Sequence, residues 1–403
     1  MNFTKIKDYI FDKPNLSRPL SADFLRVVAA FSICLYHIWQ QSWVSGGKLD
    51  FWNRTGALWV DVFIMLSAFC LFLPWANAKA DGTLKQKRKN EKVSQFYLKR
   101  AIRLIPGYYL SIAFSFVVRV ITDGCSANLI KDLTAHLTFT QMFFNVSYRN
   151  TGLNGVTWTL TVFALFYLFF PLLRNLFLKH PIITSAVMLW IQAFVTVWLL
   201  QNFENSGIDM LFNQFPAFVG VLCIGFIAAL CFSYLGRKKI MENPYFRLIC
   251  SLIGALSFIL IGFLLKYQTT QPNFKYSQVI LRMPLCVLGA CMIVFLGLGI
   301  NLPLRKILGF FSSISFNLYL WHQMLAVLIK YTLKIPYWSG DTPPNMLYDE
   351  IWMHKYNLIA WCAALIAAVA VTYLFEKPVC GFLSKKLLKT ANQATFPPKP
   401  NKR

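Results

Sequence analysis

Three ionisable residues on one apolar segment are the first candidates for chemistry. Residues 19–40 read PLSADFLRVVAAFSICLYHIWQ, with Asp23 and Arg26 near the start and His37 near the end. Arg26 and His37 are 11 residues apart, which in an α-helix places them within about 20° of one face and about 16 Å apart along the axis. Asp23 falls about 40° to the other side of that line. Because ionisable groups at membrane depth are costly and mark functional sites, the spacing predicts a reactive polar stripe that faces the protein interior.

A second apolar run, ALWVDVFIMLSAF, carries Asp61 near its start. A short connection between the two runs would make them antiparallel neighbours, and we therefore expect Asp61 to lie beside His37. A carboxylate in that position fixes the tautomer of an imidazole and raises its basicity, which suits a general base. Asp23 and Arg26 are three residues apart and are expected to pair with each other. The alternative interpretation is a buried polar network that only fixes helix packing.

A basic pair opens the third apolar run, FYLKRAIRLIPGYYL. Arg100 and Arg103 share one helical face, with Lys99 beside them. Two arginines in this arrangement form a good clamp for phosphate groups, although the same residues suit the basic flank of any membrane span. The basic loop at 79–99 that precedes them either fixes topology or attracts anionic lipid headgroups.

The candidate set is completed by four other residues, which lie later in the sequence. Trp158 lies at the start of an apolar run, where aromatic side chains commonly mark the membrane interface. Tyr319 and His322 share a helical face in SISFNLYLWHQML, and packing alone also accounts for His322. Glu376 is expected at the inner rim of the membrane, where Lys377 and the other basic flanking residues would neutralise it. No metal site is expected.

Composition defines the elements that must position these residues. The chain has 403 residues, of which 57% are hydrophobic and 14% are charged, whereas globular domains have roughly 25% charged residues. Several apolar runs reach the ~20 residues that cross a bilayer. The sequence therefore predicts an all-α polytopic membrane protein, a bundle of about ten transmembrane helices. The expected spans are approximately 20–40, 56–77, 101–121, 156–177, 182–201, 210–234, 246–266, 277–299, 309–331 and 357–376.

The net charge of +24 follows the pattern of the spans. Lysine and arginine collect in alternate connections, as the positive-inside rule demands, so the charge does not indicate a nucleic-acid partner. This bias predicts that both termini are cytoplasmic. We expect a cytoplasmic tail at 1–19, a transmembrane domain at 20–380 and a disordered cytoplasmic tail at 381–403.

Taken together, these segments resemble the acyltransferase-3 family of integral-membrane acyltransferases. The family's arginine, ten residues and histidine are matched by Arg26 to His37, and its V-D-x-F run by residues 60–69. Its R-x-x-R-I-x-P-x-Y motif is matched by residues 100–108, its Y-L-W-H by 319–322 and its E-K-P by 376–378. The correspondence extends from about residue 18 to residue 385. Two positions depart from the family pattern: Phe163 stands where the family usually has glutamate, and Ala68 stands where it usually has glycine.

The resemblance implies transfer of an acyl group, usually acetyl, from cytoplasmic acyl-coenzyme A to a hydroxyl of a cell-surface carbohydrate or glycolipid at the bacterial plasma membrane. Arg100, Arg103 and Lys99 would hold the nucleotide phosphates, and His37, oriented by Asp61, would act as general base or acyl acceptor. Arg26 would steady the donor or hold Asp23. Trp158, Tyr319, His322 and Glu376 would support the substrates.

Two alternatives belong to other classes of protein. A proton-coupled transporter or flippase would use Arg26, His37 and Asp61 as a relay and would turn over no thioester. A non-catalytic relative that binds a glycolipid is suggested by Phe163, and it would bind coenzyme A weakly or independently of Arg103.

Overall fold

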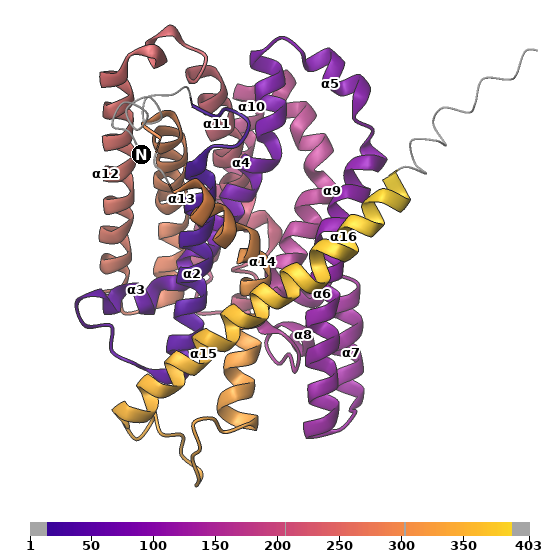
Figure 1. The fold of residues 1–403 in the computed structure, drawn as a ribbon, viewed down its shortest axis with the longest axis vertical. Coiled ribbons are helices and arrows are strands. Elements are labelled where there is room, and N and C mark those ends of the chain that lie inside the picture. The colour runs from indigo at the N-terminus through magenta and orange to yellow at the C-terminus, as the bar shows by residue number, and fades with distance from the viewer. Residues whose placement is uncertain (1–13, 206, 302–303, 389–403) are drawn as a thin grey trace, which may run out of the picture.

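The computed structural model describes residues 14–205, 207–301 and 304–388, and all regular secondary structure in these residues is helical. The α-helices form an elongated bundle (Figure 1). In chain order they are α2 (Leu20–Ser42), α3 (Asp50–Thr55), α4 (Trp59–Ala80), α5 (Leu84–Asn90), α6 (Val93–Asp123), α7 (Ala127–Leu137), α8 (Asn145–Tyr148), α9 (Trp158–Lys179), α10 (Pro181–Gln201), α11 (Val219–Leu235), α12 (Pro244–Gln268), α13 (Phe274–Leu298), α14 (Arg305–Val327), α15 (Glu350–Ala370) and α16 (Lys377–Leu383).

One of the predicted spans, at 309–331, corresponds to α14 and differs from the others. Nine helical segments within the described residues are long and apolar enough to span a membrane, and α14 is not among them. However, α14 accompanies α2 over its whole length: Ser312 donates a hydrogen bond to Asp23 near one end, and Lys330, just beyond α14, donates to the backbone oxygen of Gln41 at the other. A helix that follows its neighbour in this way covers the same depth of the bundle. Its polar side chains are tolerated because they are buried against protein rather than lipid.

Helix α2 lies at the centre of the bundle and packs against α4, α13, α14 and α15. Its neighbour α4 packs closely against α11 because Gly225 leaves room for the α4 backbone. A Cβ atom at Gly225 would approach the Met65 carbonyl oxygen to 2.5 Å and the Ala68 Cβ to 2.8 Å. The alanine at position 68 is therefore accommodated by a glycine on the facing helix.

Several helix ends differ from the predicted spans. Helix α6 begins at Val93, before the predicted start at residue 101, and so includes the basic pair. Helix α15 begins at Glu350 rather than near 357, because the Asp349 carboxylate caps it by accepting a hydrogen bond from the Trp352 amide (3.0 Å).

The last helix is continuous beyond its predicted end. Helix α15 extends through a π-helical turn at Val371–Glu376 into α16 and a further turn at Ser384–Leu388; its orange-to-yellow ribbon crosses the bundle obliquely in Figure 1. The tail predicted to begin at residue 381 is thus helical to Leu388. Of the two predicted tails, residues 1–13 and 389–403 lie outside the described residues.

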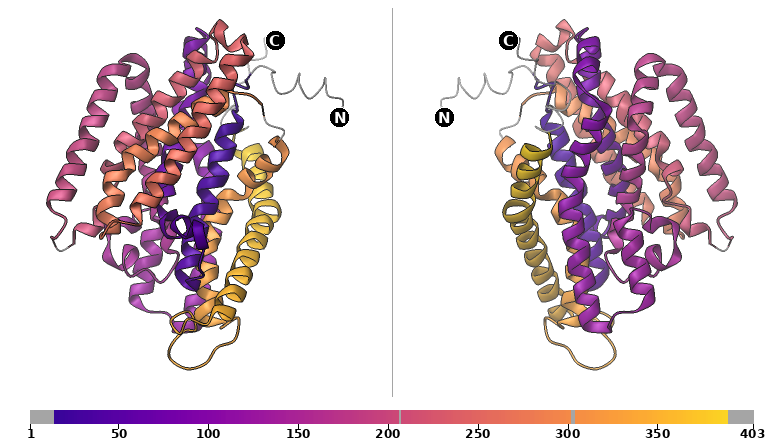
Figure 2. Two further views of the ribbon diagram at one scale, coloured as in Figure 1. Left: turned by 90° about the vertical axis from the view of Figure 1, so that its left-hand side faces the viewer. Right: turned by 90° about the vertical axis from the view of Figure 1, so that its right-hand side faces the viewer.

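Both ends of the described chain lie at one end of the bundle, which we call the basic end because it carries α5 and the start of α6. Asn77, near the end of α4, donates a hydrogen bond to the Leu16 carbonyl oxygen, and Cys380 of α16 contacts the Ile102 carbonyl oxygen at the start of α6. Helices α7 and α8 lie at the opposite end (Figure 1). Seen from the side, α2 runs through the interior of the bundle between the two ends (Figure 2).

Candidate functional site

A large cavity penetrates the bundle from the basic end. Its volume is about 730 Å³, and its walls come from α2, α4, α5, α6, α9, α14 and the final helix. Among the described residues, five cationic side chains line it (Arg26, Lys87, Lys99, Arg100 and Arg103), against the single carboxylate of Glu91. A cavity that concentrates positive charge between apolar helices favours an anionic ligand.

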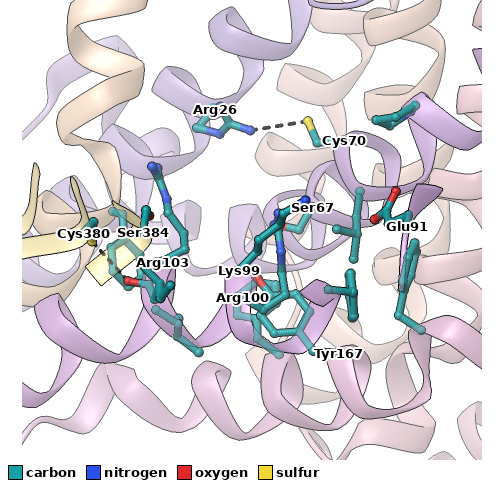
Figure 3. A pocket seen from close by; sticks show the side chains of 18 of the residues that line it. Arg26, Ser67, Cys70, Glu91, Lys99, Arg100, Arg103, Tyr167, Cys380 and Ser384 are labelled. Atoms are coloured by element: carbon teal, nitrogen blue, oxygen red, sulfur yellow. Dashed lines mark hydrogen bonds between the residues drawn. The ribbon is translucent and has the colours of Figure 1, made fainter. Parts of the chain in front are cut away.

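The predicted basic cluster at the start of α6 belongs to this cavity. Lys99 and Arg103 are exposed, whereas Arg100 is half-buried. The buried Nε atom of Arg100 has no hydrogen-bond partner among the described residues, and such an unpaired donor is costly unless a ligand or water satisfies it. Figure 3 shows Lys99, Arg100 and Arg103 on the same cavity as Arg26 and Cys70.

Arg26 forms the inner part of the cavity wall. Its guanidinium lies 3.5 Å from Asp23, donates to the Ser312 hydroxyl (3.1 Å) and contacts the Cys70 sulfur (3.4 Å). Asp23 also pairs with Arg18 (3.1 Å) and accepts from Ser312 (2.7 Å). The predicted pairing of Asp23 with Arg26 is confirmed. Because this pairing fixes one side of the guanidinium, Arg26 presents a positioned charge to the cavity.

His37 lies further along α2 and is not part of the cavity wall. Its Nδ1 atom is 3.0 Å from the Gln40 Oε1 atom, and the Gln40 amide nitrogen donates to the Tyr36 hydroxyl (2.9 Å). Since that second bond leaves only Oε1 to face His37, Gln40 accepts a hydrogen bond from the Nδ1–H group. The Nε2 atom of a neutral His37 therefore carries the free lone pair that a base or nucleophile requires.

Asp61 does not contact His37, and this predicted pairing is wrong. Its carboxylate is paired instead with Arg282 of α13 at 3.1 Å, and both side chains are 1% exposed. Arg282 also donates to the carbonyl oxygens of Phe212 and Ala217 and lies over the Phe218 ring at 4.3 Å. Asp61 thus neutralises a buried arginine that fixes the turn before α11.

The second histidine lies close to the first. The rings of His37 and His322 have centroids 5.2 Å apart, and Tyr319 lies 5.9 Å from His322. The His322 Nδ1 atom bonds the Leu318 carbonyl oxygen, while its buried Nε2 atom has no partner among the described residues. The structure therefore brings His37, His322 and Tyr319 together, although they come from helices far apart in the sequence.

An aromatic partition separates this histidine pair from the cavity. Phe63, which lines the cavity, stacks on Tyr319 with centroids 6.3 Å apart and planes at 12°. The Tyr319 hydroxyl is held by the Val156 carbonyl oxygen (2.6 Å) and by Thr159 (2.9 Å). The stacked pair therefore lies between the cavity wall and the histidine pair.

The remaining predicted residues have other surroundings. Trp158 stacks against Phe218, with centroids 6.2 Å apart, on the side of the Arg282 pair. Glu376 accepts a hydrogen bond from the Asn317 amide, whereas Lys377 lies over the Tyr373 ring at 3.7 Å. Lys377 and Glu376 form no salt bridge within the described residues, because successive residues of a helix point in different directions. The charges of Arg103 and Lys377 nevertheless both act favourably on the Glu376 carboxylate, so the expected compensation by basic flanking residues acts at longer range.

Phe163, at the position where the family usually has glutamate, lines the cavity beside Phe63 and Tyr167. Its ring centroid is 6.4 Å from Phe63 and 6.2 Å from Tyr167. An aromatic wall thus occupies the inner cavity of this chain where a carboxylate would otherwise stand.

Sequence reasoning missed several residues of the site: Gln40, Ser67, Cys70, Lys87, Glu91, Tyr167 and Ser312. Gln40 had a usable signal, because it lies three residues after His37 and shares its helical face. The others had none, since their place depends on which helices pack together. Among the described residues, no cluster of His, Cys, Asp and Glu could hold a metal ion.

Fold and cavity together define an integral-membrane protein with a cationic chamber for an anionic ligand and an imidazole pair beyond it. A more specific assignment comes from the sequence relationship: the acyltransferase domain of the acyltransferase-3 family matches residues 20–377. The chain belongs to this family.

Curated relatives agree with that assignment. The chain is 25% identical over 312 residues to a protein of Acidianus two-tailed virus named as an acetyltransferase, covering 76% of this chain and 82% of the relative. It is 25% identical over 359 residues to peptidoglycan O-acetyltransferase OatA of Listeria monocytogenes, covering 81% of this chain and 51% of that protein. Nodulation protein 10 of Rhizobium leguminosarum is 26% identical over 176 residues, which are 38% of this chain and 44% of the relative. The chain thus spans about half the length of its two bacterial relatives. No solved structure matches the chain significantly.

Proposed function

We propose that this membrane acyltransferase moves an acyl group, with acetyl as the expected case, from cytoplasmic acyl-coenzyme A to a hydroxyl of an extracytoplasmic or lipid-linked carbohydrate. Its place is the bacterial plasma membrane, with both termini in the cytoplasm. The observation that carries the proposal is the cationic cavity, which opens at the basic end and reaches Arg26 on the same helix as His37. The positive-inside rule supports the cytoplasmic assignment of that end.

The donor nucleotide fits the charge and the apolar depth of the cavity. Arg100, Arg103 and Lys99 hold phosphate oxygens at the basic end, where arginines on one helical face favour bidentate contacts. The pantetheine arm then runs inward between α4, α6 and α9 along an apolar wall that includes Phe63 and Phe163. Arg26 is the innermost charge on this path and steadies the thioester end.

His37 performs the proton transfer. With Nδ1 donating to Gln40, its free Nε2 takes the proton from the acceptor hydroxyl as the oxygen attacks the thioester carbonyl. The carbon–sulfur bond breaks, the ester forms, and the proton passes to the departing thiolate of coenzyme A. The Phe63–Tyr319 partition must yield to bring the carbonyl to this position.

The acceptor class is supported by the known activity of a relative. One relative is a peptidoglycan O-acetyltransferase, and peptidoglycan presents sugar hydroxyls outside the membrane. A carbohydrate acceptor approaching from the end that carries α7 and α8 would reach His37 without entering the donor cavity.

The proposal is tested with purified protein in nanodiscs and with cells. Coenzyme A release from acetyl-coenzyme A in the presence of an acceptor should fall by at least about 100-fold in His37→Ala, with matched expression. Mass spectrometry of surface glycans should show loss of one acyl group in cells that carry this variant. Intact transfer by His37→Ala would refute the role of His37. The absence of any thioester turnover in the wild-type protein would favour the transporter or the non-catalytic binder instead.

A further inference from the structure

A second, smaller cavity adjoins the donor cavity at the basic end. Its volume is about 380 Å³, and it is lined by α5 and its surroundings: Ala78, Thr83, Gln86, Lys87, Asn90, Glu91 and Lys99. Lys87, Glu91 and Lys99 also line the larger cavity. These three side chains therefore form the boundary between two adjoining spaces, and a ligand bound in one can extend into the other.

Lys87 differs from the other basic residues of α5. It is half-buried, whereas Lys85, Arg88 and Lys89 are exposed and line neither cavity. Its Nζ atom lies 4.8 Å from the centre of the Trp75 ring and 3.2 Å from a Glu91 carboxylate oxygen. A lysine that only fixes topology or attracts lipid stays in solvent, so the burial of Lys87 requires another explanation.

The support beneath Lys87 is rigid. Trp75 is 2% exposed, and the Arg174 guanidinium lies 3.9 Å from the centre of its ring. The tryptophan ring thus contacts two cations, a favourable arrangement for an electron-rich ring. Because its Nζ atom contacts both Trp75 and Glu91, the Lys87 ammonium is positioned at the boundary without a ligand.

The two cavities together carry enough cationic side chains to bind two separate anionic groups. Arg100 and Arg103 lie on the larger cavity alone, whereas Lys87 and Lys99 face both. Within the part of the chain that the structure describes, Glu91 is the one carboxylate on either wall. Its contact with Lys87 offsets the lysine charge while no competing anion is present. A phosphomonoester, with a charge of about −1.5 to −2 at pH 7, would displace Glu91 from Lys87.

Building on the proposed function, we propose that the smaller cavity binds the 3′-phosphomonoester of the donor nucleotide through Lys87 and Lys99. The larger cavity then holds the pyrophosphate and the pantetheine arm. The protein would select acyl-coenzyme A over acyl donors that carry phosphopantetheine without the 3′-phosphorylated nucleotide.

The experiment compares binding of coenzyme A and 3′-dephospho-coenzyme A by isothermal titration calorimetry. The full chain is reconstituted in nanodiscs of phosphatidylcholine alone, so that no anionic headgroup competes for the site. We expect the wild-type protein to bind coenzyme A about tenfold more tightly or better, as one charge-assisted contact allows. In Lys87→Met this ratio should fall toward one, because coenzyme A binding weakens while dephospho-coenzyme A binding does not.

Two variants keep the result interpretable. Lys89→Met removes an exposed charge from the same helix and should leave the ratio unchanged. Glu91→Gln removes the competing carboxylate and should tighten coenzyme A binding several-fold with little effect on the dephospho form. Thermal unfolding of each variant confirms that it is folded.

The outcomes separate the two proposals. If Lys87→Met leaves the ratio of the affinities for coenzyme A and 3′-dephospho-coenzyme A unchanged, the 3′-phosphate site is overturned. The donor proposal then stays intact. A wild-type protein that binds both nucleotides equally would do the same. If the wild-type protein binds neither nucleotide, both the donor proposal and the inference that rests on it are refuted.

Discussion

The orientation of His37 depends on a neighbour three residues away rather than on a distant carboxylate. Gln40 accepts from Nδ1 and is itself fixed by the Tyr36 hydroxyl. A neutral amide sets the tautomer as a carboxylate would, but it adds no charge beside the ring. Gln40 is therefore a positioning residue in the proposed mechanism, and the role first expected of Asp61 is assigned to it.

Gln40→Leu should lower kcat for acyl transfer by about 10–100-fold, by analogy with the loss of the hydrogen-bonding partner that orients a metal-bound histidine. The KM for acetyl-coenzyme A should change little, because the donor cavity does not include Gln40. Steady-state kinetics in nanodiscs measure both quantities. Gln40→Glu, which keeps an acceptor oxygen, should restore part of kcat.

Gln41→Leu is the matched control for this substitution, since Gln41 contributes its backbone oxygen to Lys330. It should retain kcat. Equal losses in Gln40→Leu and Gln41→Leu, or a loss in Gln40→Leu that appears only in KM, would contradict the positioning role.

At the scale of the helices, the Asp61–Arg282 pair joins α4 to α13. Asp61→Asn leaves Arg282 as a buried charge without its counter-ion, which typically costs about 3–5 kcal/mol. We expect a clear fall in the midpoint of thermal unfolding of the purified protein, monitored by tryptophan fluorescence. Combining Asp61→Leu with Arg282→Met removes both charges and should recover part of the loss. If Asp61→Asn kept its unfolding midpoint but abolished transfer, Asp61 would act in the chemistry instead.

The partition between α4 and α14 makes a separate prediction. Phe63→Ala removes the ring that stacks on Tyr319 and should open a path for water from the cavity to the histidine pair. Hydrolysis of acetyl-coenzyme A without an acceptor should therefore rise several-fold, as measured by release of free thiol. Leu71→Ala, which changes another cavity-lining side chain, should not raise it. A hydrolysis rate in Phe63→Ala equal to that of Leu71→Ala would show that the partition does not limit access.

At the scale of the whole molecule, the two ends of the bundle differ, and they are expected to face opposite sides of the membrane. Both ends of the described chain lie at the basic end, and the prediction places that end in the cytoplasm. Cys125, an exposed thiol in the connection between α6 and α7, would then face outward. A membrane-impermeant maleimide added to intact cells should label Cys125, with Cys125→Ser as the negative control. A cysteine introduced by Lys89→Cys should react only after the membrane is opened, and the reverse pattern of labelling would invert the topology.

The membrane class and the approximate spans could be predicted from sequence because hydrophobic length and charge bias act locally along the chain. The same holds for the Arg26–His37 stripe and for the pairing of Asp23 with Arg26, since α-helical periodicity fixes which residues share a face. The mean hydropathy of α14 is too low for the helix to count as a candidate span. Its position nevertheless agrees with the predicted span at 309–331.

Only the tertiary structure decided which helices meet. It paired Asp61 with Arg282, 221 residues away, placed His322 beside His37 and brought Lys87 and Glu91 to the border of two cavities. Helical periodicity predicts that a side chain faces the interior, but it does not predict which helix the side chain will contact. The lateral order of the helices results from packing among all of them. The sequence alone therefore determined which polar residues share one face of α2, and the packed bundle determined their partners.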